Sequence, residues 1–451
     1  MQIAKKMKRI NILCFLIIIS NVIIAQNHTK CLTNEIVNKL DKEEPIYSNN
    51  RHNINSANRE WILNSNSEKQ TINIPIVVHV IHRSTHSTVG FGTNISNNQI
   101  ADAIRILNED YSKTNPEFPN PPRSYFKNNA GNPNLKFCLA TVDPNGQPTT
   151  GVTRTATSKQ NFNPSSESND MKRSQDGGKD GWDPDKYLNI WVCDLAGSAS
   201  SGLILGYAYL PGLPSWLKWR DGLVIDFQWF GTIDGAAPSS DGRTATHEIG
   251  HYLGLNHTFC ESQSGGCCDN DDDNVNDTPA SYYNNNGEDG PYYGSVNANT
   301  NNNTCNDLLY QNIFNSNVID MDENFMAYSR DTWMFTNDQA NVMAATLNNY
   351  RLSLKNSNVS IDCSGNSPTN ISLKKIDKIE IFPNPSSGKI NIKTENKIQS
   401  IDIFNLIGEC VYSNYNIDNN IFDISKNPNG VYFLNILTNQ KKYTKKIILL
   451  K

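Results

Sequence analysis

The residues best suited to chemistry lie in the stretch HEIGHYLGLNH, which begins at residue 247. Two histidines four positions apart on a helix project from one face, so His247 and His251 can present imidazole nitrogens to one cation. Glu248 lies beside the first histidine, where its carboxylate can take a proton from a metal-bound water rather than bind the metal. This spacing predicts a Zn²⁺ site that performs hydrolysis.

The residues after this helix complete the expected site. Gly254 has no Cβ, so the chain can end the helix there and turn back sharply, and His257 becomes a third ligand. Three nitrogens leave the fourth tetrahedral position of Zn²⁺ open for water, whose pKa the cation lowers toward neutrality. The alternative is a helix with incidental surface histidines, but three of the eight histidines fall at the required spacings beside a glutamate and a glycine.

Apolar patterns predict the elements that would carry this site. In TINIPIVVHVIH, residues 71–82, apolar side chains occur at both phases, as in a strand buried on two faces. Ser96 and Gln99 form a capping box that opens an amphipathic helix through Tyr111. Short strands are expected in LKFCLATVD, YLNIWVCDL and GLVIDFQWF. These segments predict a mixed α/β domain, with the Asn-rich residues 283–304 as a long surface loop.

The N-terminal end of the chain differs from this core. Four basic residues within positions 5–9 precede an apolar run that ends at Ala25, which predicts a secretory signal peptide over residues 1–25. A membrane anchor is the alternative, but the run has about 16 residues against the roughly 20 that span a bilayer, and no later segment is long and apolar enough. The mature protein is therefore expected to have no stable membrane span. Residues 26–70 are polar and are interpreted as a prosegment, with one helical piece, EIVNKLDKEEP.

Net charge and cysteine content limit the kinds of partner and the compartment that are expected for this chain. The net charge is −5 and the pI about 5.9, with no basic stripe to attract phosphate backbones, so nucleic acid is excluded. Export to an oxidising compartment allows disulfides. Removal of Cys14 with the signal leaves nine of the ten cysteines, so at least one thiol is free or pairs elsewhere, and the connectivity stays open.

Near residue 326 the sequence reads ENFMAYSRDTWMFT, which resembles the Met-turn of metzincin proteases. The resemblance implies that Met326 lies beneath the zinc site as a hydrophobic base and that Tyr328 reaches the metal or the developing oxyanion. Taken alone, a methionine in this setting would be a core residue. Together with the three histidines, it favours the functional interpretation.

Three stretches together resemble the pappalysin family of metzincins: HEIGHYLGLNHTF, DNVNDTP from residue 273, and NFMAY. The resemblance spans residues 70–350. It implies an α+β fold with a metzincin-type zincin catalytic domain over residues 71–362. A mixed twisted sheet with a backing helix and the active-site helix is expected on one side of the cleft, and a loop-rich half on the other.

Bacterial relatives of this type carry calcium next to the cleft, which implies a structural Ca²⁺ site in this chain. Calcium prefers hard oxygen ligands. The acidic cluster that could supply them comprises Asp269, Asp271, Asp272, Asp273 and Asp277. The favoured ligands are Asp273, Asp277, Thr278 and the carbonyl of Val275. The alternative is a solvated acidic loop.

In related proteases an aspartate three places after the Met-turn tyrosine lines the pocket for the side chain that follows the cut bond. The matching position is Asp331. A buried carboxylate there would pair with Arg or Lys, so the resemblance implies cleavage on the amino side of basic residues. The alternative is an exposed acid in a turn.

The cysteines depart from the family pattern, since Trp333 stands where related proteases have a cysteine. Cys305 is expected to pair with Cys267 or Cys268, and a Cys138–Cys193 disulfide is the less favoured expectation.

In the prosegment, Cys31 resembles the cysteine with which some metzincin zymogens occupy the open zinc position, where a thiolate would block hydrolysis. The alternative is a disulfide with an odd cysteine downstream. Activation would require removal of the prosegment, and the predicted specificity makes Arg51 and Arg59 candidate self-cleavage points.

The C-terminal part has a composition of its own. Residues 363–375 are interpreted as a linker, and residues 376–451 as a small all-β sandwich domain. FPNPSSGKINI, IFNLIGECVYS and NGVYFLNI resemble the sorting domain of type IX secretion substrates. The resemblance implies export across the outer membrane by the type IX secretion machinery, with release or attachment at the cell surface. The alternative is a small adhesive module that binds substrate.

These patterns predict a secreted or cell-surface zinc endopeptidase that acts on proteins or peptides. Glu248 would serve as general base and then acid, and Tyr328 would stabilise the oxyanion. The alternative from another class is a surface adhesin or binding protein that keeps a zincin fold without turnover.

Overall fold

A computed structural model describes the chain over residues 31–65, 70–196, 203–260, 268, 273–282, 293–309, 312–365, 380–394, 397–415, 420–438 and 442–451. The expected signal peptide lies outside these ranges, as do Cys267, Asp269, Asp271 and Asp272. The described residues fall into two compact units, one within residues 1–369 and the other within residues 370–451. No helix in the described ranges has the length and apolar character needed to cross a membrane.

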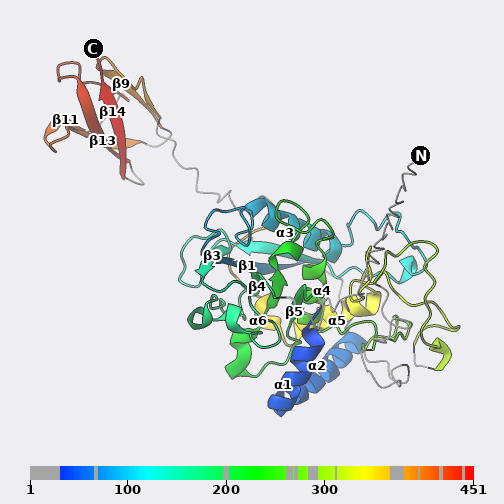
Figure 1. Ribbon diagram of the computed structural model, residues 1–451. Helices are drawn as coiled ribbons and strands as arrows, with labels where there is room; N and C mark the ends of the chain where they lie inside the picture. Colours follow the sequence, from blue (N-terminus) through cyan, green and yellow to red (C-terminus); the bar gives the residue numbers. More distant parts are fainter. Residues whose placement is uncertain are drawn as a thin grey trace, which may run out of the picture. The chain divides into compact units, whose positions relative to one another are not determined.

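A mixed sheet forms the centre of the first unit (Figure 1). Its order is β5-β6-β4-β1-β2-β7, and β3 also pairs with β1. The strands are β1 (Ile72–Arg83), β2 (Leu135–Ala140), β3 (Val152–Thr157), β4 (Leu188–Cys193), β5 (Gly206–Ala208), β6 (Leu223–Asp226) and β7 (Ile361–Asp362). β1 runs parallel to β2, β3 and β4, whereas β5 and β7 are antiparallel to their neighbours.

The strand predicted over residues 71–82 is confirmed as β1, and it is buried from Ile74 to His82 because both faces of the sheet are covered. The strands expected in LKFCLATVD, YLNIWVCDL and GLVIDFQWF are β2, β4 and β6. Strands β3 and β5 were not predicted.

Helices cover one face of the sheet. They are α3 (Asn97–Tyr111), α4 (Thr244–Tyr252), α5 (Asn337–Asn348) and α6 (Leu352–Lys355). Ile100 of α3 and Ile249 of α4 share a buried core with Ile76 of β1. The predicted start of α3 is confirmed, since the Ser96 side chain accepts a hydrogen bond from the Gln99 backbone N–H. Short 3-10 turns cover Lys127–Asn129, Asp170–Lys172, Ser174–Asp176, Ser215–Arg220, Phe227–Trp229 and Asp307–Leu309.

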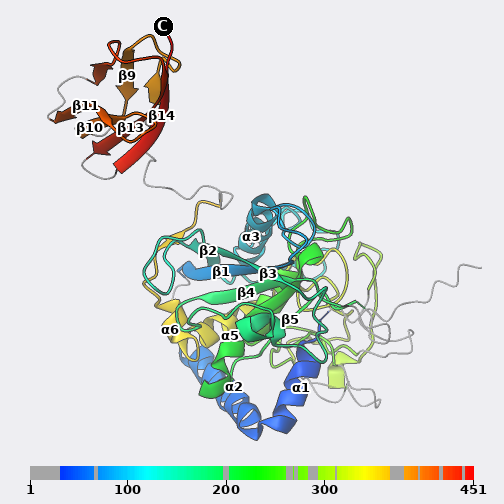
Figure 2. The same cartoon turned by 60° about the vertical axis from the view of Figure 1, so that its left-hand side comes forward.

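Two N-terminal helices belong to the same unit, α1 (Thr33–Glu43) and α2 (Pro45–Asn64). Figure 2 shows them together, with α2 beside α5. The helical piece expected in EIVNKLDKEEP is confirmed as part of α1. Helix α2 was not predicted, because its sequence is polar and only Tyr47 and Asn58 are buried along it.

The disulfides agree with the sequence in one case and correct it in another. Cys268 pairs with Cys305, which is one of the two expected pairings. The expected Cys138–Cys193 pair is wrong, because β7 returns antiparallel to the end of β2 and brings Cys363 to Cys138.

Three of the described cysteines are free, Cys31, Cys193 and Cys410. Cys193 cannot reach Cys138, because it is buried on β4, which is separated from β2 by β1. Since Cys31 is itself free, the alternative of a disulfide at Cys31 is wrong.

Within its described residues the second unit contains strands and no helix, as predicted. One sheet has the order β11-β10-β13-β14 and the other β12-β9-β8. Buried residues of both sheets, including Ile390 and Ile436, share one core, so the unit is a small β-sandwich. The strands are β8 (Glu380–Phe382), β9 (Lys389–Lys393), β10 (Ile398–Phe404), β11 (Cys410–Tyr415), β12 (Ile421–Asp423), β13 (Gly430–Thr438) and β14 (Lys442–Leu449).

Candidate active site and metal centre

The end of helix α3 holds helix α4 in place. Tyr111 donates a hydrogen bond to the carbonyl of Thr246 at 2.9 Å, and the Thr246 hydroxyl donates to Asp110 at 2.7 Å. Arg243, just before α4, pairs with the same carboxylate at 3.4 Å. Burial nevertheless raises the pKa of Asp110 to about 7. Sequence reasoning missed these positioning residues, because no motif spacing links them to the histidines.

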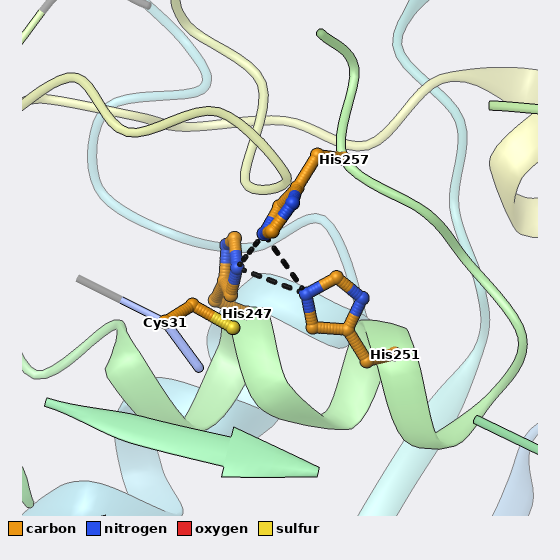
Figure 3. A group of neighbouring side chains, drawn as sticks. All are labelled: Cys31, His247, His251 and His257. Atoms are coloured by element: carbon orange, nitrogen blue, oxygen red, sulfur yellow. Dashed lines mark hydrogen bonds between the residues drawn. The ribbon is translucent and has the colours of Figure 1, made fainter. Parts of the chain in front are cut away.

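The three histidines converge on one point (Figure 3). His247 and His251 project from α4, and His257 follows the turn at Gly254, which has a φ of +97°. The Nε2 atoms of His247 and His257 lie 3.0 Å apart, and Nε2 of His251 lies 3.2 Å from that of His247 and 3.1 Å from that of His257.

Backbone carbonyls hold the other ring nitrogens of two of these residues. Nδ1 of His247 lies 2.7 Å from the carbonyl oxygen of Phe325, and Nδ1 of His251 lies 2.7 Å from that of Leu255. A proton on each Nδ1 donates to the carbonyl and leaves the Nε2 lone pair available to a cation. Burial, with His257 and His247 nearby, lowers the pKa of His251, which favours the neutral ring that a metal needs.

The donor set fits Zn²⁺. Nitrogens at about 2.0–2.1 Å from zinc and at tetrahedral angles lie about 3.3 Å from one another, close to the spacing of this triangle. Three neutral imidazoles with lone pairs directed at one another repel, and a shared cation removes that repulsion. The geometry therefore suits a metal better than a hydrogen-bonded histidine cluster.

Glu248 is buried beside the histidines, and its two oxygens differ in their surroundings. Oε2 accepts hydrogen bonds from the Thr33 hydroxyl at 3.2 Å and the Cys31 thiol at 3.5 Å. Oε1 is buried and has no hydrogen-bond partner among the residues described. Burial raises the pKa of Glu248 to about 8, against the lowering by Cys31 and Thr33. Such a carboxyl group is suited to accept and return a proton.

Met326 and Tyr328 lie next to the histidines. A Cβ built on Gly250 would collide with the sulfur of Met326, so the methionine packs directly against the backbone of α4. The ring of Tyr328 lies 4.9 Å from that of His257 between centres, and its hydroxyl donates to the carbonyl of Cys31 at 3.3 Å.

The segment from Cys31 to Thr33 runs along the edge strand β5. Cys31 and Gly206 form a parallel bridge, and the Thr33 hydroxyl accepts a hydrogen bond from the Ala208 backbone N–H at 3.0 Å. The Cys31 sulfur and one nitrogen of each of the three histidines all lie within 4.8 Å of one another (Figure 3). The thiol therefore faces the candidate metal centre. Sequence reasoning missed Thr33.

A pocket opens beside His247 and Glu248. Its walls include the aromatic residues Trp229, Tyr293 and Phe325, together with Arg330 and Thr332.

Asp331 does not line this pocket in the way that the sequence suggested. It is exposed rather than buried and has a left-handed backbone with a φ of 62°, while its neighbours Arg330 and Thr332 face the pocket. The left-handed backbone turns residue 331 away from the wall that its neighbours form.

The candidate calcium loop is arranged differently from the histidines. Asp273 accepts hydrogen bonds from the Val275 backbone N–H at 3.1 Å and the Thr278 hydroxyl at 2.5 Å. Asp277 accepts one from the Asp338 backbone N–H at 2.9 Å, and its Oδ1 is buried without a partner in the described part of the chain. Burial raises the pKa of Asp277 to about 6. The unpaired Oδ1 fits a cation, although the Asp273 carboxylate is already bonded within its own loop.

Two family models match the chain. The peptidase family described as "Pregnancy-associated plasma protein-A" matches residues 171–348. The "Secretion system C-terminal sorting domain" matches residues 380–450.

Solved structures from Tannerella forsythia are similar to the chain. Mature mirolysin in complex with a cleaved peptide is 35% identical with a TM-score of 0.52, and the match covers 64% of this chain and 97% of that chain. A promirolysin mutant is 32% identical with a TM-score of 0.56, covering 72% and 97%.

Curated relatives include extracellular metalloproteases of fungi. The one from Pyricularia oryzae is 29% identical over 219 residues, and that from Arthroderma otae is 45% identical over 82 residues. The chain spans 59% of the length of the Pyricularia oryzae protein and 28% of the Arthroderma otae protein.

Proposed function

The chain belongs to the pappalysin family of metalloproteases, and from this premise we propose that it is a zinc endopeptidase that hydrolyses peptide bonds in proteins. The observation that carries the proposal is the convergence of three buried imidazole nitrogens beside a buried carboxylate with an unpaired oxygen. Zinc held by His247, His251 and His257 supplies Lewis-acid chemistry, since it lowers the pKa of water and polarises a substrate carbonyl.

The side chains around the histidines would carry out proton transfer and stabilise the oxyanion. Glu248 accepts a proton at Oε1 and returns it to the leaving amine, for which its raised pKa is suited. Once the Tyr328 hydroxyl is no longer bonded to the Cys31 carbonyl, it donates to the oxyanion that develops on the substrate. Met326 packs against the backbone of α4 at Gly250 and so helps to hold the helix that carries His247 and His251.

Substitution of Glu248 tests this assignment. Glu248→Gln keeps the shape of the side chain and removes the proton acceptor, so digestion of a denatured protein should slow by a factor of 10³ or more, roughly 4 kcal/mol, at unchanged zinc content. Glu109→Gln, on a partly exposed side chain of α3 that pairs with Arg105, is the matched control. Full activity of the Glu248→Gln variant would reject the mechanism and leave the binding-protein alternative standing.

We also propose cleavage on the amino side of Arg or Lys. The support is the place of Asp331 three residues after Tyr328, next to two residues that line the pocket. Its exposure limits the energy of a charge pair with substrate, so Asp331→Asn should reduce the preference for basic over neutral residues by only about three- to tenfold. Profiling of cleaved bonds in a peptide library measures this, and the absence of Arg or Lys enrichment in the unmodified enzyme would contradict the proposal.

For the loop of residues 273–278 we propose a structural calcium ion bound by Asp273, Asp277, Thr278 and the Val275 carbonyl. The unpaired buried Oδ1 of Asp277 supports the site, and hard oxygen donors suit calcium. Added calcium should raise the melting temperature by several degrees, and Asp277→Asn should abolish that rise. Equal shifts with magnesium would show that the loop does not select calcium.

The N-terminal segment is proposed to keep the enzyme latent through Cys31. The thiol faces the histidines, and the Thr33 hydroxyl donates a hydrogen bond to Glu248. The Tyr328 hydroxyl donates to the Cys31 carbonyl, so the N-terminal segment contacts every proposed catalytic group at once. Helix α2 contains both Arg51 and Arg59, and a protease needs an extended substrate, so cleavage at either residue requires local unfolding of α2.

The C-terminal unit indicates export by type IX secretion to the cell surface or the medium. As its partner we propose the type IX secretion machinery. A chain that lacks residues 376–451 should remain inside the cell, and its appearance in the medium at the normal rate would contradict this role.

A further inference from the structure

We propose that residues 206–213 and helix α5 form a docking surface for residues 31–65, and that this surface retains the segment after the chain between the segment and β1 is cut. The proposal rests on the latency proposed above and extends it. A cut outside the docked segment does not activate the enzyme, because activation requires the segment to leave.

The first part of this surface is the edge strand β5 and its continuation. Four alternate positions, from Gly206 to Gly212, are each hydrogen-bonded to the N-terminal segment. The bonds are Leu32 N–H to the Gly206 carbonyl at 3.1 Å, Ala208 N–H to the Thr33 hydroxyl at 3.0 Å, Tyr47 hydroxyl to the Leu210 carbonyl at 2.9 Å and Asn50 Nδ2 to the Gly212 carbonyl at 2.9 Å. None of them involves the Cys31 sulfur, so these four bonds do not depend on the metal.

The second part lies on helix α5. Asn58 of α2 is buried, and it donates from Nδ2 to the Thr346 hydroxyl at 2.9 Å. Its Oδ1 accepts a hydrogen bond from Nδ2 of Asn349 at 3.0 Å. A buried amide with both ends bonded is costly to leave unpaired, so this contact acts as a latch at the far end of the segment from Cys31.

Apolar side chains add to the first set of hydrogen bonds. Leu32, Ile36, Val37, Leu40 and Tyr47 of the segment share one buried cluster with Tyr209, Leu210 and Leu213. Departure of the segment would expose this cluster on both sides, which opposes dissociation. The occupant of the surface is therefore the segment itself, whether or not it is still covalently joined.

A full-length chain with a site-specific protease sequence in place of residues 66–69 tests the proposal. Glu248→Gln is added to prevent self-cleavage. After cutting, size-exclusion chromatography with mass measurement should show the N-terminal segment eluting with the rest of the chain at micromolar concentration. Immediate separation would overturn the proposal.

Two matched variants test the latch. Asn58→Asp should speed loss of the cut segment on the order of 10- to 100-fold, because it buries a charge and removes a donor. Asn53→Asp, the same change at an exposed position of α2, should have no effect. If Asn58→Asp does not fold, Asn349→Ala removes one latch bond from the other side. Equal loss rates in the latch and control variants would overturn the role of Asn58.

The outcome can be separated from failure of the proposed latency. In a chain that retains Glu248, the cut complex with its segment bound should be inactive and should gain activity only as the segment dissociates. Full activity while the segment is still bound would reject latency and leave the docking surface intact.

Discussion

Buried histidines occur both at the candidate metal centre and on strand β1, and their ring nitrogens are used differently. In His79 of β1, Nδ1 lies 2.8 Å from the Thr153 hydroxyl and Nε2 lies 3.0 Å from Oδ1 of Asn189. In His247 and His251, Nδ1 bonds to a backbone carbonyl, while Nε2 faces other imidazole nitrogens. Burial alone therefore does not identify a ligand; the convergence of Nε2 atoms from three histidines does.

The largest effect should come from removing a ligand. His251→Ala should lower the zinc content from one ion per chain to near zero and reduce proteolysis by a factor of about 10⁴ or more, because two imidazoles hold the ion far less tightly. Metal analysis and a peptide assay measure the two changes. His79→Gln is the control at the other site and should retain zinc, and loss of zinc there would remove the distinction between the two regions.

The next effect concerns stability and pH at His79. Burial lowers the pKa of His79 to about 4, against a raising effect of the Asn189 hydrogen bond. The unfolded chain therefore binds a proton between pH 6.5 and 4 that the folded chain does not. Because of this group, the unfolding free energy decreases by up to about 3 kcal/mol as the pH falls through that window.

A comparison of variants isolates that contribution. His79→Gln should lose less stability than the unmodified protein between pH 7 and pH 4.5 in urea unfolding, while zinc release is common to both proteins. Parallel pH profiles for the two would show that His79 is not the group responsible.

A smaller effect is expected from the aromatic neighbour of the metal ligands. Tyr328→Phe keeps the ring beside His257 but removes the hydroxyl, so kcat should fall by about 10²-fold, roughly 2.7 kcal/mol, with little change in zinc content or melting temperature. An unchanged kcat would exclude Tyr328 from oxyanion stabilisation.

The smallest effect belongs to the aromatic neighbour of His79. The ring centre of Trp182 lies 6.0 Å from that of His79 in an edge-on arrangement, which is a packing contact. Trp182→Phe should therefore lower the unfolding free energy by about 1–2 kcal/mol and leave kcat unchanged. Loss of kcat without loss of stability would show that the surroundings of His79 also contribute to chemistry.

Local patterns in the sequence were sufficient to predict a large part of the fold. The apolar run of β1 needs partners on both faces, and Ser96 can cap only the helix that follows it, so neither prediction depends on distant residues. The zinc motif is also local, because helix geometry alone places His247 and His251 on one side of α4.

Other features depend on contacts between distant parts of the chain, and the sequence does not reveal them. Helix α2 is stabilised through Asn58 and its partners on α5, which no periodicity indicates. Cys138 pairs with Cys363 only because β7 returns to β2. The exposure of Asp331 follows from a left-handed backbone, which a non-glycine residue rarely adopts.

The Cys138–Cys363 disulfide also has a mechanical consequence. Strand β7 pairs with β2 through only two residue positions, so the end of the first unit would peel away easily under tension applied to the tail. The covalent bond carries such a load directly from Cys363 to β2, which pairs with the central strand β1, and leaves α5 and α6 unloaded. The first unit can therefore be pulled or tethered by its C-terminal end without unravelling from that end.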